Sequence, residues 1–229
     1  MNRKNNCEAS FTQAVIFDMD GVLTDSEPVI NQAAILGLRE YGVEARPEDF
    51  LPFVGTGEDR YIGGVAEKYG VPYKPEMKEL VYRIYLRLLP DRLRRFPGVH
   101  GLLRKLRDHG LALGLATSAD RIKMTANLRA IEVPEAWFSA IVVGQDIERK
   151  KPAPDLYLAC ADKLEIEPRF CCVVEDAING IQAAKAAGMR CLAVATSFPA
   201  GELRKQAAPD RIRTSLAEVT LHDLGCKSA

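Results

Sequence analysis

The residues best suited to chemistry all occur in the same context: each comes shortly after a short apolar segment of the chain. In chain order they are Asp18, Asp20, Thr117, Ser118, Lys151, Glu175 and Asp176. Asp18 and Asp20 stand two residues apart, so in extended geometry their side chains share a face. With Glu175 and Asp176 they make an all-oxygen set of ligands, which suits Mg²⁺ better than a softer metal.

Thr117 and Lys151 add hydrogen-bond donors that suit the oxygens of a phosphoryl group. A carboxylate nucleophile beside a hard cation, a hydroxyl and an ammonium is typical of phosphoryl transfer. The three histidines lie outside these clusters, so the predicted chemistry needs no imidazole.

Each of these residues alone also has an ordinary structural role. Asp18-Met19-Asp20 is compatible with a turn or a helix cap, and Lys151 with a solvated loop. Thr117-Ser118 would serve as the N-cap of a helix over 120–130, and Glu175-Asp176 as the cap of a helix near Ile178. Their order, each pair at its own strand end, favours a joint site.

The elements that must position these side chains alternate between buried strands and helices. Short apolar runs predict strands at 14–17, 111–116, 140–143, 171–174 and 191–194, and helical periods follow at 102–110, 122–131, 154–164 and 178–188. Such alternation predicts a mostly parallel sheet with helices on its faces. Ligands bind at the carboxyl edge of such sheets, where the polar residues stand.

One stretch breaks the alternation. Residues 28–92 hold three helical patterns and no strand, at 29–41, 58–69 and 77–89. We therefore expect an α/β fold, a Rossmann-like doubly wound parallel sheet, with an inserted small helical cap domain. The predicted core comprises 1–27 and 93–229, and the predicted cap 28–92.

Composition narrows the class of protein. The 229 residues carry 31 basic and 31 acidic side chains, and this balance disfavours a nucleic-acid partner. The six cysteines form no C-x-x-C pair, which argues against a zinc site or a disulfide framework. The N-terminal residues include no apolar segment of a secretory signal, and no run of about 18 apolar residues predicts a membrane span. We expect a cytoplasmic protein with no membrane association that acts on something small.

Four motifs in this order resemble the haloacid dehalogenase superfamily, in the subgroup related to β-phosphoglucomutase and small sugar-phosphate phosphatases. They read DMDGVLTDSE at 18–27, ATSAD at 116–120, KKPAPD at 150–155 and VVEDAINGIQAAKAAG at 173–188. The resemblance covers about 13–215, and the position of the helical insertion after the first motif agrees with it.

The resemblance implies a role for each matching residue. Asp18 would attack phosphorus and form an aspartyl-phosphate, and Asp20 would protonate the leaving oxygen and later activate water. Thr117 and the backbone N–H of Ser118 would hold the phosphoryl group, and Lys151 would stabilise its negative charge. Mg²⁺ would be bound by Asp18, the carbonyl of Asp20, Asp176 and Glu175.

The cap loop is predicted to read the substrate. Gly55, Thr56, Gly57, Glu58 and Arg60 are candidate binding residues, with Thr56 or Glu58 bonding sugar hydroxyls and Arg60 meeting a second anion. The alternative is an ordinary helix start, with Thr56 as its cap and acids in the first turn.

Two departures weaken the resemblance to the mutase itself. Ile30 stands where β-phosphoglucomutase and many of its kin have a histidine, and Gly57-Glu58 stands where the mutase has an arginine. We therefore expect a Mg²⁺-dependent phosphatase that acts, as a monomer, on a small phosphorylated metabolite, with a sugar phosphate as the favoured class. The alternatives are a β-phosphoglucomutase-type mutase and a catalytically idle relative that binds a ligand or partner.

Overall fold

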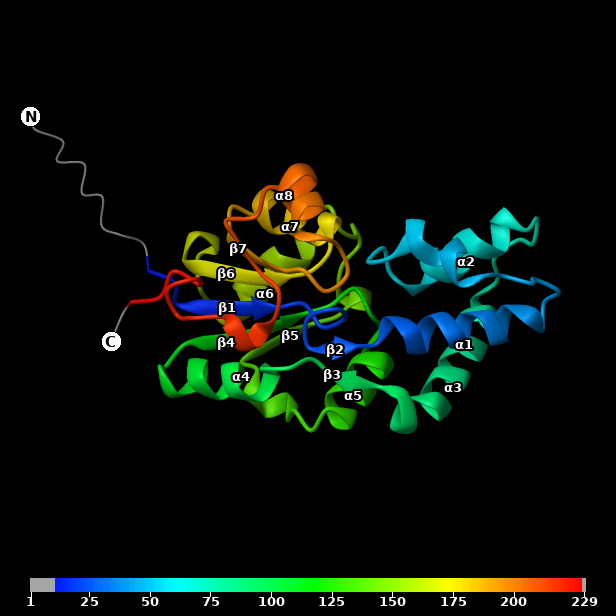
Figure 1. The fold of residues 1–229 in the computed structure, drawn as a ribbon, viewed down its shortest axis with the longest axis horizontal. Helices are drawn as coiled ribbons and strands as arrows, with labels where there is room; N and C mark the ends of the chain where they lie inside the picture. Colours follow the sequence, from blue (N-terminus) through cyan, green and yellow to red (C-terminus); the bar gives the residue numbers. More distant parts are fainter. Residues whose placement is uncertain (1–10, 228–229) are drawn as a thin grey trace, which may run out of the picture.

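A six-stranded sheet forms the centre of the larger part of the molecule (Figure 1). The computed structural model describes residues 11–227. All neighbouring strands in the sheet are parallel, in the order β5-β4-β1-β6-β7-β8. Their bounds are β1 Ala14–Phe17, β4 Ala112–Ala116, β5 Ala140–Val142, β6 Cys171–Glu175, β7 Arg190–Val194 and β8 Arg211–Arg213. The doubly wound α/β fold predicted from the sequence is therefore confirmed.

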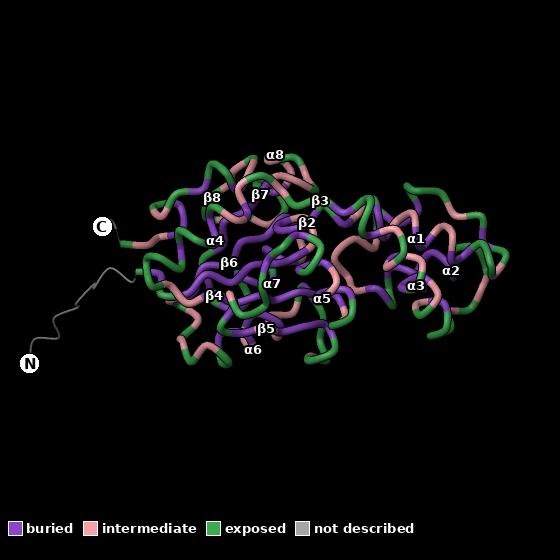
Figure 2. Tube along the Cα trace, turned by 90° about the horizontal axis from the view of Figure 1, so that it is seen from below, coloured by how far each residue is buried: buried purple, intermediate pink, exposed green. Residues whose placement is uncertain are grey.

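Helices cover both faces of this sheet, and each face has its own apolar core. Val15 and Phe17 of β1 face the helices α4 and α5, whereas Ala14 and Ile16 face α6 and α7. Figure 2 shows the resulting band of buried chain along the sheet. The bounds of these helices are α4 Val99–Asp108, α5 Arg121–Ala130, α6 Asp155–Leu164, α7 Ile178–Ala186 and α8 Ala200–Ala207, of which α8 packs on α7. Strands buried on both faces explain the near-continuous apolar runs in the sequence.

Three helices make up the smaller part, which stands beside one end of the sheet (Figure 1). They are α1 Glu27–Arg39, α2 Glu58–Lys68 and α3 Pro75–Arg92, and the 3₁₀ turn η1 Pro47–Phe53 lies between the first two. The short strands β2 Thr24–Asp25 and β3 Arg94–Arg95 pair antiparallel at the place where the chain leaves the sheet and returns to it. We call 28–92 the cap and keep its predicted limits as a proposal.

Strands of two or three residues without an apolar run leave no recognisable pattern, and several short elements were not predicted from the sequence. They are β2, β3, β8 and α8, and the remaining 3₁₀ turns are η2 Glu135–Trp137, η3 Gly144–Asp146, η4 Pro168–Phe170 and η5 Leu216–Glu218. Within 11–227, no helix combines the length and the apolar character that a membrane crossing requires.

Asp49 forms hydrogen bonds to three residues of the cap, and these bonds lead to a prediction about how stability depends on pH. Its carboxylate accepts hydrogen bonds from Lys68 at 2.5 Å and Tyr69 at 2.6 Å, and from the backbone N–H of Arg46 at 2.8 Å. The bonds from Lys68 and Tyr69 hold the pKa of Asp49 well below its usual value. A lowered pKa stabilises the fold above the unfolded-state value of about 3.9, and this contribution is lost as the pH falls below it.

Asp49→Asn is therefore expected to lower the free energy of unfolding at pH 7 and to lower it by a smaller amount at pH 3, where the contribution of the charge is only partly lost. Urea unfolding of both proteins at the two pH values measures the difference. An equal loss at both pH values would show that packing of the side chain, not its charge, is responsible.

Candidate active site

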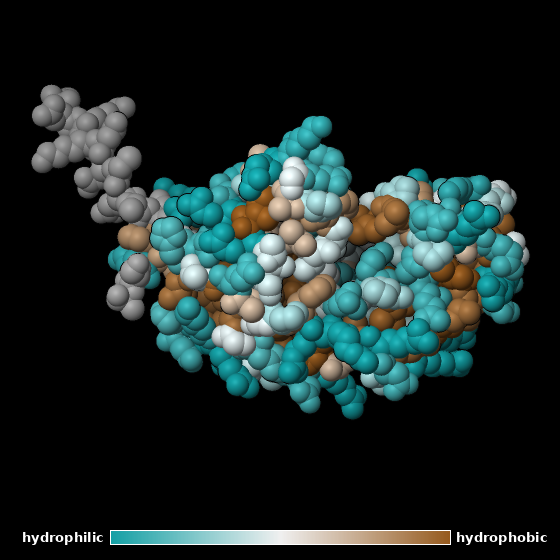
Figure 3. All heavy atoms as spheres, in the orientation of Figure 1, coloured by the Kyte–Doolittle hydropathy of each residue, from teal (hydrophilic) through white to brown (hydrophobic). Residues whose placement is uncertain are grey.

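A cleft lies between the carboxyl edge of the sheet and the cap, where the surface in Figure 3 is indented. The core contributes mostly polar residues, which include Asp18, Asp20, Thr117, Ser118, Lys123, Lys151, Glu175, Asp176 and Ser197. The cap contributes Ile30, Phe53, Val54, Gly55, Gly57, Glu58 and Tyr61, and Glu27 stands at its start. The strand ends thus converge as the sequence predicts, because parallel strands present their carboxyl ends at one edge.

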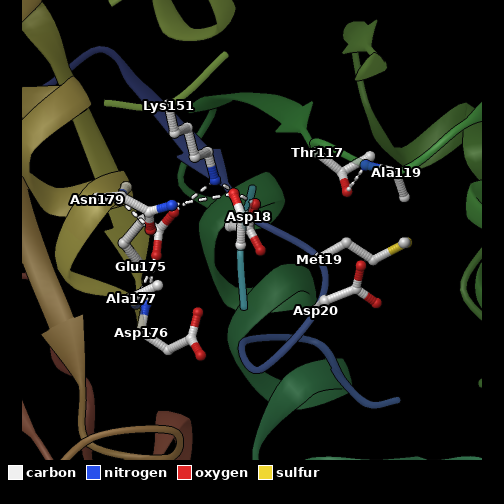
Figure 4. Close-up of polar contacts among 12 residues, drawn as sticks. Asp18, Met19, Asp20, Thr117, Ala119, Lys151, Glu175, Asp176, Ala177 and Asn179 are labelled. Atoms are coloured by element: carbon white, nitrogen blue, oxygen red, sulfur yellow. Dashed lines mark hydrogen bonds and ion pairs between the residues drawn. The ribbon is translucent and has the colours of Figure 1, made fainter. Parts of the chain in front are cut away.

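A lysine paired with two carboxylates occupies the bottom of the cleft. Lys151 donates from Nζ to Asp18 Oδ1 at 2.6 Å and to Glu175 Oε1 at 2.5 Å, and all three side chains are buried. Figure 4 shows Asp18 between this pair on one side and Thr117 with Asp20 on the other. Lys151 is therefore not the solvated loop residue of the alternative interpretation.

Glu175 is fully occupied by protein donors. Its Oε1 also accepts from the Tyr157 hydroxyl at 2.9 Å, and its Oε2 accepts from the backbone N–H groups of Asp176 at 2.7 Å and Ala177 at 2.8 Å. Burial acts to raise the pKa of Glu175, but Lys151 and these bonds bring it below its usual value. Both oxygens of Glu175 are therefore already bonded to protein donors, which leaves neither free for the predicted role as a direct metal ligand. The contacts of Glu175 instead orient Lys151 and the loop before α7.

The remaining carboxylates carry uncompensated charge. Burial raises the pKa of Asp18 to about 7 against the opposing effect of Lys151. Burial and the charges of Glu175 and Asp18 hold the pKa of Asp176 well above its usual value, although the Ser197 hydroxyl donates to it. Three buried carboxylates therefore lie close together with one ammonium, which pairs with Asp18 and Glu175 but not with Asp176. This is the electrostatic setting that a divalent cation relieves.

The donor set fits Mg²⁺ only when backbone oxygen is included. Within the described part of the chain, no three acidic, histidine or cysteine side chains converge to hold a metal ion. Both oxygens of Glu175 accept hydrogen bonds from the protein, and the Asp20 side chain faces Lys123. Asp18 uses only Oδ1 on Lys151, so the Asp18 and Asp176 carboxylates are left. The predicted carbonyl of Asp20 is then the third protein oxygen, in keeping with the few protein ligands that Mg²⁺ usually takes.

Gly21 keeps the Asp176 carboxylate close to the loop after β1. A Cβ atom at this position would lie 1.9 Å from Asp176 Oδ2, and the backbone has a φ of +80°. Only glycine accepts both the left-handed conformation and this approach.

Thr117 and Ser118 lie opposite Lys151 across the cleft. Thr117 is buried at the end of β4, and its Oγ1 accepts from the backbone N–H of Ala119 at 3.1 Å. The N-cap of α5 is Asp120, so neither residue caps that helix as the alternative would have it. The buried Ser118 hydroxyl has no hydrogen-bond partner among the described residues.

The structure divides the predicted cap residues into two groups. Gly55, Gly57 and Glu58 line the cleft. Thr56 does not, because its hydroxyl donates to the Phe53 carbonyl at 2.7 Å. Arg60 also lies outside, where it pairs with Glu67 at 2.8 Å and stacks over Phe53.

Glu58 is the cap side chain with an unused acceptor. It is buried, and its Oε2 has no hydrogen-bond partner among the described residues. Burial raises the pKa of Glu58, although Lys123 opposes this effect. Gly55 joins the cap to the core, since its carbonyl accepts from Asn179 Nδ2 of α7 at 3.0 Å.

Several residues of the site were not found from the sequence. Ser197 follows β7, so the rule of polar residues after strands would have found it. Lys123 and Tyr61 lie within helices, where a lysine or tyrosine is ordinary, and nothing in the sequence singles them out.

The close approach of Gly180 to the Glu175 carboxylate leads to a testable prediction. A Cβ atom at Gly180 in α7 would lie 1.6 Å from Glu175 Oε1, a carboxylate held by four donors. Gly180→Ala is expected to destabilise the protein by about 1–3 kcal/mol. Because a displacement near 1 Å in a catalytic group costs roughly 100-fold, phosphate release should fall as far.

The matched control for this substitution is Gly101→Ala. Gly101 lies in α4, and a Cβ atom there meets nothing within 4 Å. This control should gain up to about 1 kcal/mol from helix propensity. Denaturant unfolding and phosphate release measure both variants, and equal behaviour of the two would contradict the predicted clash.

Comparisons with known proteins agree with this arrangement. Residues 15–194 match the family described as haloacid dehalogenase-like hydrolase. The chain is 43% identical over 215 residues to protein SUPPRESSOR OF QUENCHING 1, chloroplastic, of Arabidopsis thaliana, which covers 92% of this chain but only 20% of that protein. It is 30% identical over 214 residues to hexitol phosphatase B of Escherichia coli, covering 92% and 96% of the two chains.

A solved structure is similar over nearly the whole chain. CbbY from Rhodobacter sphaeroides, in complex with phosphate, has a TM-score of 0.83 and 26% sequence identity. The similarity covers 93% of this chain and 99% of that one.

Proposed function

Since this chain belongs to the haloacid dehalogenase-like hydrolase family, we propose that it is a Mg²⁺-dependent phosphoric monoester hydrolase. Its substrate is a small phosphorylated metabolite, with a sugar phosphate as the class we favour, and the reaction passes through an aspartyl-phosphate. The observation that carries the proposal is the Asp18 carboxylate, buried at 2.6 Å from the Lys151 ammonium and facing Thr117 across the cleft.

Each polar residue of the core has its own role in the reaction. An Asp18 oxygen attacks phosphorus while the bond from phosphorus to the leaving oxygen breaks, and Asp20 donates a proton to that oxygen. Asp20 then takes a proton from the water that hydrolyses the aspartyl-phosphate, which releases phosphate and restores Asp18. Lys151, the Thr117 hydroxyl and the backbone N–H of Ser118 stabilise the negative charge on the transferring group.

Mg²⁺ would be held by the carboxylates of Asp18 and Asp176 and by the backbone carbonyl of Asp20. When bound, it supplies positive charge beside the phosphoryl oxygens. Three buried carboxylates with one ammonium support this proposal, because the protein alone leaves their repulsion uncompensated.

Two polar side chains on the otherwise apolar cap side of the cleft, Glu58 and Tyr61, favour a leaving group with hydroxyls. Glu58 offers an unused acceptor to a hydroxyl, and Tyr61 donates to Glu27 at 2.8 Å beside it. The two lysines that line the cleft, Lys123 and Lys151, each pair with two carboxylates, and Arg60 lies outside it. A second phosphate would therefore meet carboxylates without an available cation, which disfavours the bisphosphate of a mutase. The similarity to hexitol phosphatase B also supports a phosphorylated carbohydrate.

We keep the predicted cytoplasmic location and monomeric state as proposals. The balanced charge of the whole chain is what supports the expectation that nucleic acid is not a partner.

The experiment that tests the function is phosphate release from a panel of substrates, with Mg²⁺ and with EDTA. The panel includes hexitol and hexose phosphates, both anomers of glucose 1-phosphate, phosphoglycolate and nucleotides. We expect metal-dependent release from sugar and hexitol phosphates. Isomerisation of glucose 1-phosphate that needs a bisphosphate primer would identify a mutase, and no turnover of any compound would identify an idle binder.

A further inference from the structure

Lys123 is a buried lysine that the reaction proposed above does not use. It lies in α5, and only 4% of its side chain is exposed. Its Nζ donates to Asp20 Oδ2 at 2.8 Å and to Glu58 Oε1 at 3.0 Å. One ammonium thus joins the core residue expected to transfer protons to a residue of the cap.

The second oxygen of Asp20 is held from the same helix. Asn127 stands one helical turn after Lys123, on the same face, and donates from Nδ2 to Asp20 Oδ1 at 3.3 Å. The Ser26 hydroxyl donates to the same oxygen. Both carboxylate oxygens of Asp20 are therefore fixed, which leaves the side chain one orientation within this network.

Both α5 residues that hold Asp20 also contact the cap. Lys123 bonds Glu58 of α2, and Asn127 accepts from the Tyr85 hydroxyl of α3 at 2.6 Å. These bonds exist only while the cap lies against the core. The same two side chains, Lys123 and Asn127, therefore contribute both to the orientation of Asp20 and to the contacts between cap and core.

The electrostatics keep Lys123 charged in this position. Burial acts to lower the pKa of Lys123, but Asp20 and Glu58 raise it well above its usual value. A buried ammonium is tolerated because two carboxylates and the ring of Tyr85, 5.8 Å from Nζ, surround it.

We propose that Lys123 is a positioning residue: it orients Asp20 for proton transfer and, through Glu58, makes that orientation depend on a docked cap. The proposal rests on the proposed function, because it takes Asp20 as the group that protonates the leaving oxygen. In the ratio kcat/KM, which reports the steps up to departure of the leaving group, a misplaced Asp20 impairs only substrates whose leaving group needs that proton. The later activation of water by Asp20 is common to all substrates and affects kcat.

The test compares two leaving groups in matched variants. One substrate is a hexitol phosphate, whose alkoxide must be protonated, and the other is para-nitrophenyl phosphate, whose phenolate leaves without a proton. Glu58→Gln serves as the reference, since it retains the bond between Lys123 and Asp20. The double variant Lys123→Met/Glu58→Gln then removes the ammonium without leaving a buried Glu58 carboxylate unpaired, a change that buried pairs often tolerate.

Relative to Glu58→Gln, the double variant is expected to lose about 100-fold in kcat/KM on the hexitol phosphate, the lower range of proton-transfer catalysis. On para-nitrophenyl phosphate, the loss in kcat/KM should be less than about fivefold, because no proton is transferred to that leaving group. Lys123→Arg keeps a cation beside Asp20 and should retain most of the hexitol phosphate activity. Lys185→Met, which removes an exposed lysine paired with Asp210, is the surface control.

Three outcomes overturn the proposal. Equal losses on both substrates would make Lys123 a structural residue, and a raised KM with unchanged kcat would make it a substrate contact. A double variant as active as Glu58→Gln would remove any role for Lys123. Failure of the proposed function is distinct, since the unsubstituted protein would then release phosphate from neither substrate.

Discussion

Asp18→Asn is expected to abolish phosphate release, with a loss of more than about 10⁴-fold, while the protein stays folded. The amide of asparagine cannot attack phosphorus, so no covalent intermediate forms. The same substitution removes one of the two buried carboxylates that pair with the Lys151 ammonium. Because burial raises the pKa of Asp18, its charged form is unfavourable in the fold, and the variant should unfold at an equal or higher denaturant concentration.

Two measurements on this variant separate chemistry from folding. Phosphate release and mass spectrometry of acid-quenched protein follow turnover and the aspartyl-phosphate, and urea unfolding follows stability. Asp25→Asn is the matched control, because Asp25 is an exposed residue of β2 in the same segment. Turnover that persists in Asp18→Asn would show that another group attacks phosphorus.

Lys151→Met is expected to impair both activity and stability. It removes the ammonium between Asp18 and Glu175, which leaves two buried carboxylates without their cation. Breaking a buried pair in this way costs about 3–5 kcal/mol of the free energy of unfolding. Loss of the charge that stabilises the transferring group should lower kcat by about 100- to 1,000-fold.

The double variant Lys151→Met/Glu175→Gln distinguishes the effect of Lys151 on stability from its effect on activity. Removing the Glu175 charge together with its partner should recover part of the stability, but it cannot restore the missing positive charge, so activity stays low. Denaturant unfolding and phosphate release of the two single variants and the double variant form the cycle that measures this coupling. Recovery of activity in the double variant would show that Lys151 serves only to hold Glu175.

The sequence alone determined the sheet and the core of the site. Apolar runs such as 14–17 and 171–174 predict strands because both faces of a parallel sheet are buried, and the structure places β1 and β6 there. Strand ends meet at one edge in this fold, so Asp18, Thr117 and Lys151 could be placed together from their order in the chain. Short elements without an apolar run were missed: β8 has the sequence Arg-Ile-Arg, whereas the equally short β5 was predicted from its apolar residues.

The tertiary structure alone decided the cap side of the site. Residues close together at the start of α2 differ in position: Glu58 lines the cleft, whereas Thr56 bonds the Phe53 carbonyl and Arg60 pairs with Glu67. Lys123 could not be singled out in the sequence because a lysine in a helix is ordinarily solvated. In the structure it is buried where Asp20, Glu58 of α2 and Tyr85 of α3 meet α5. The direction of a side chain on a helix or loop depends on which partner packs against it, and that partner is far away in the chain. Strand ends converge by topology, but the contacts between cap and core depend on how two separately formed surfaces meet.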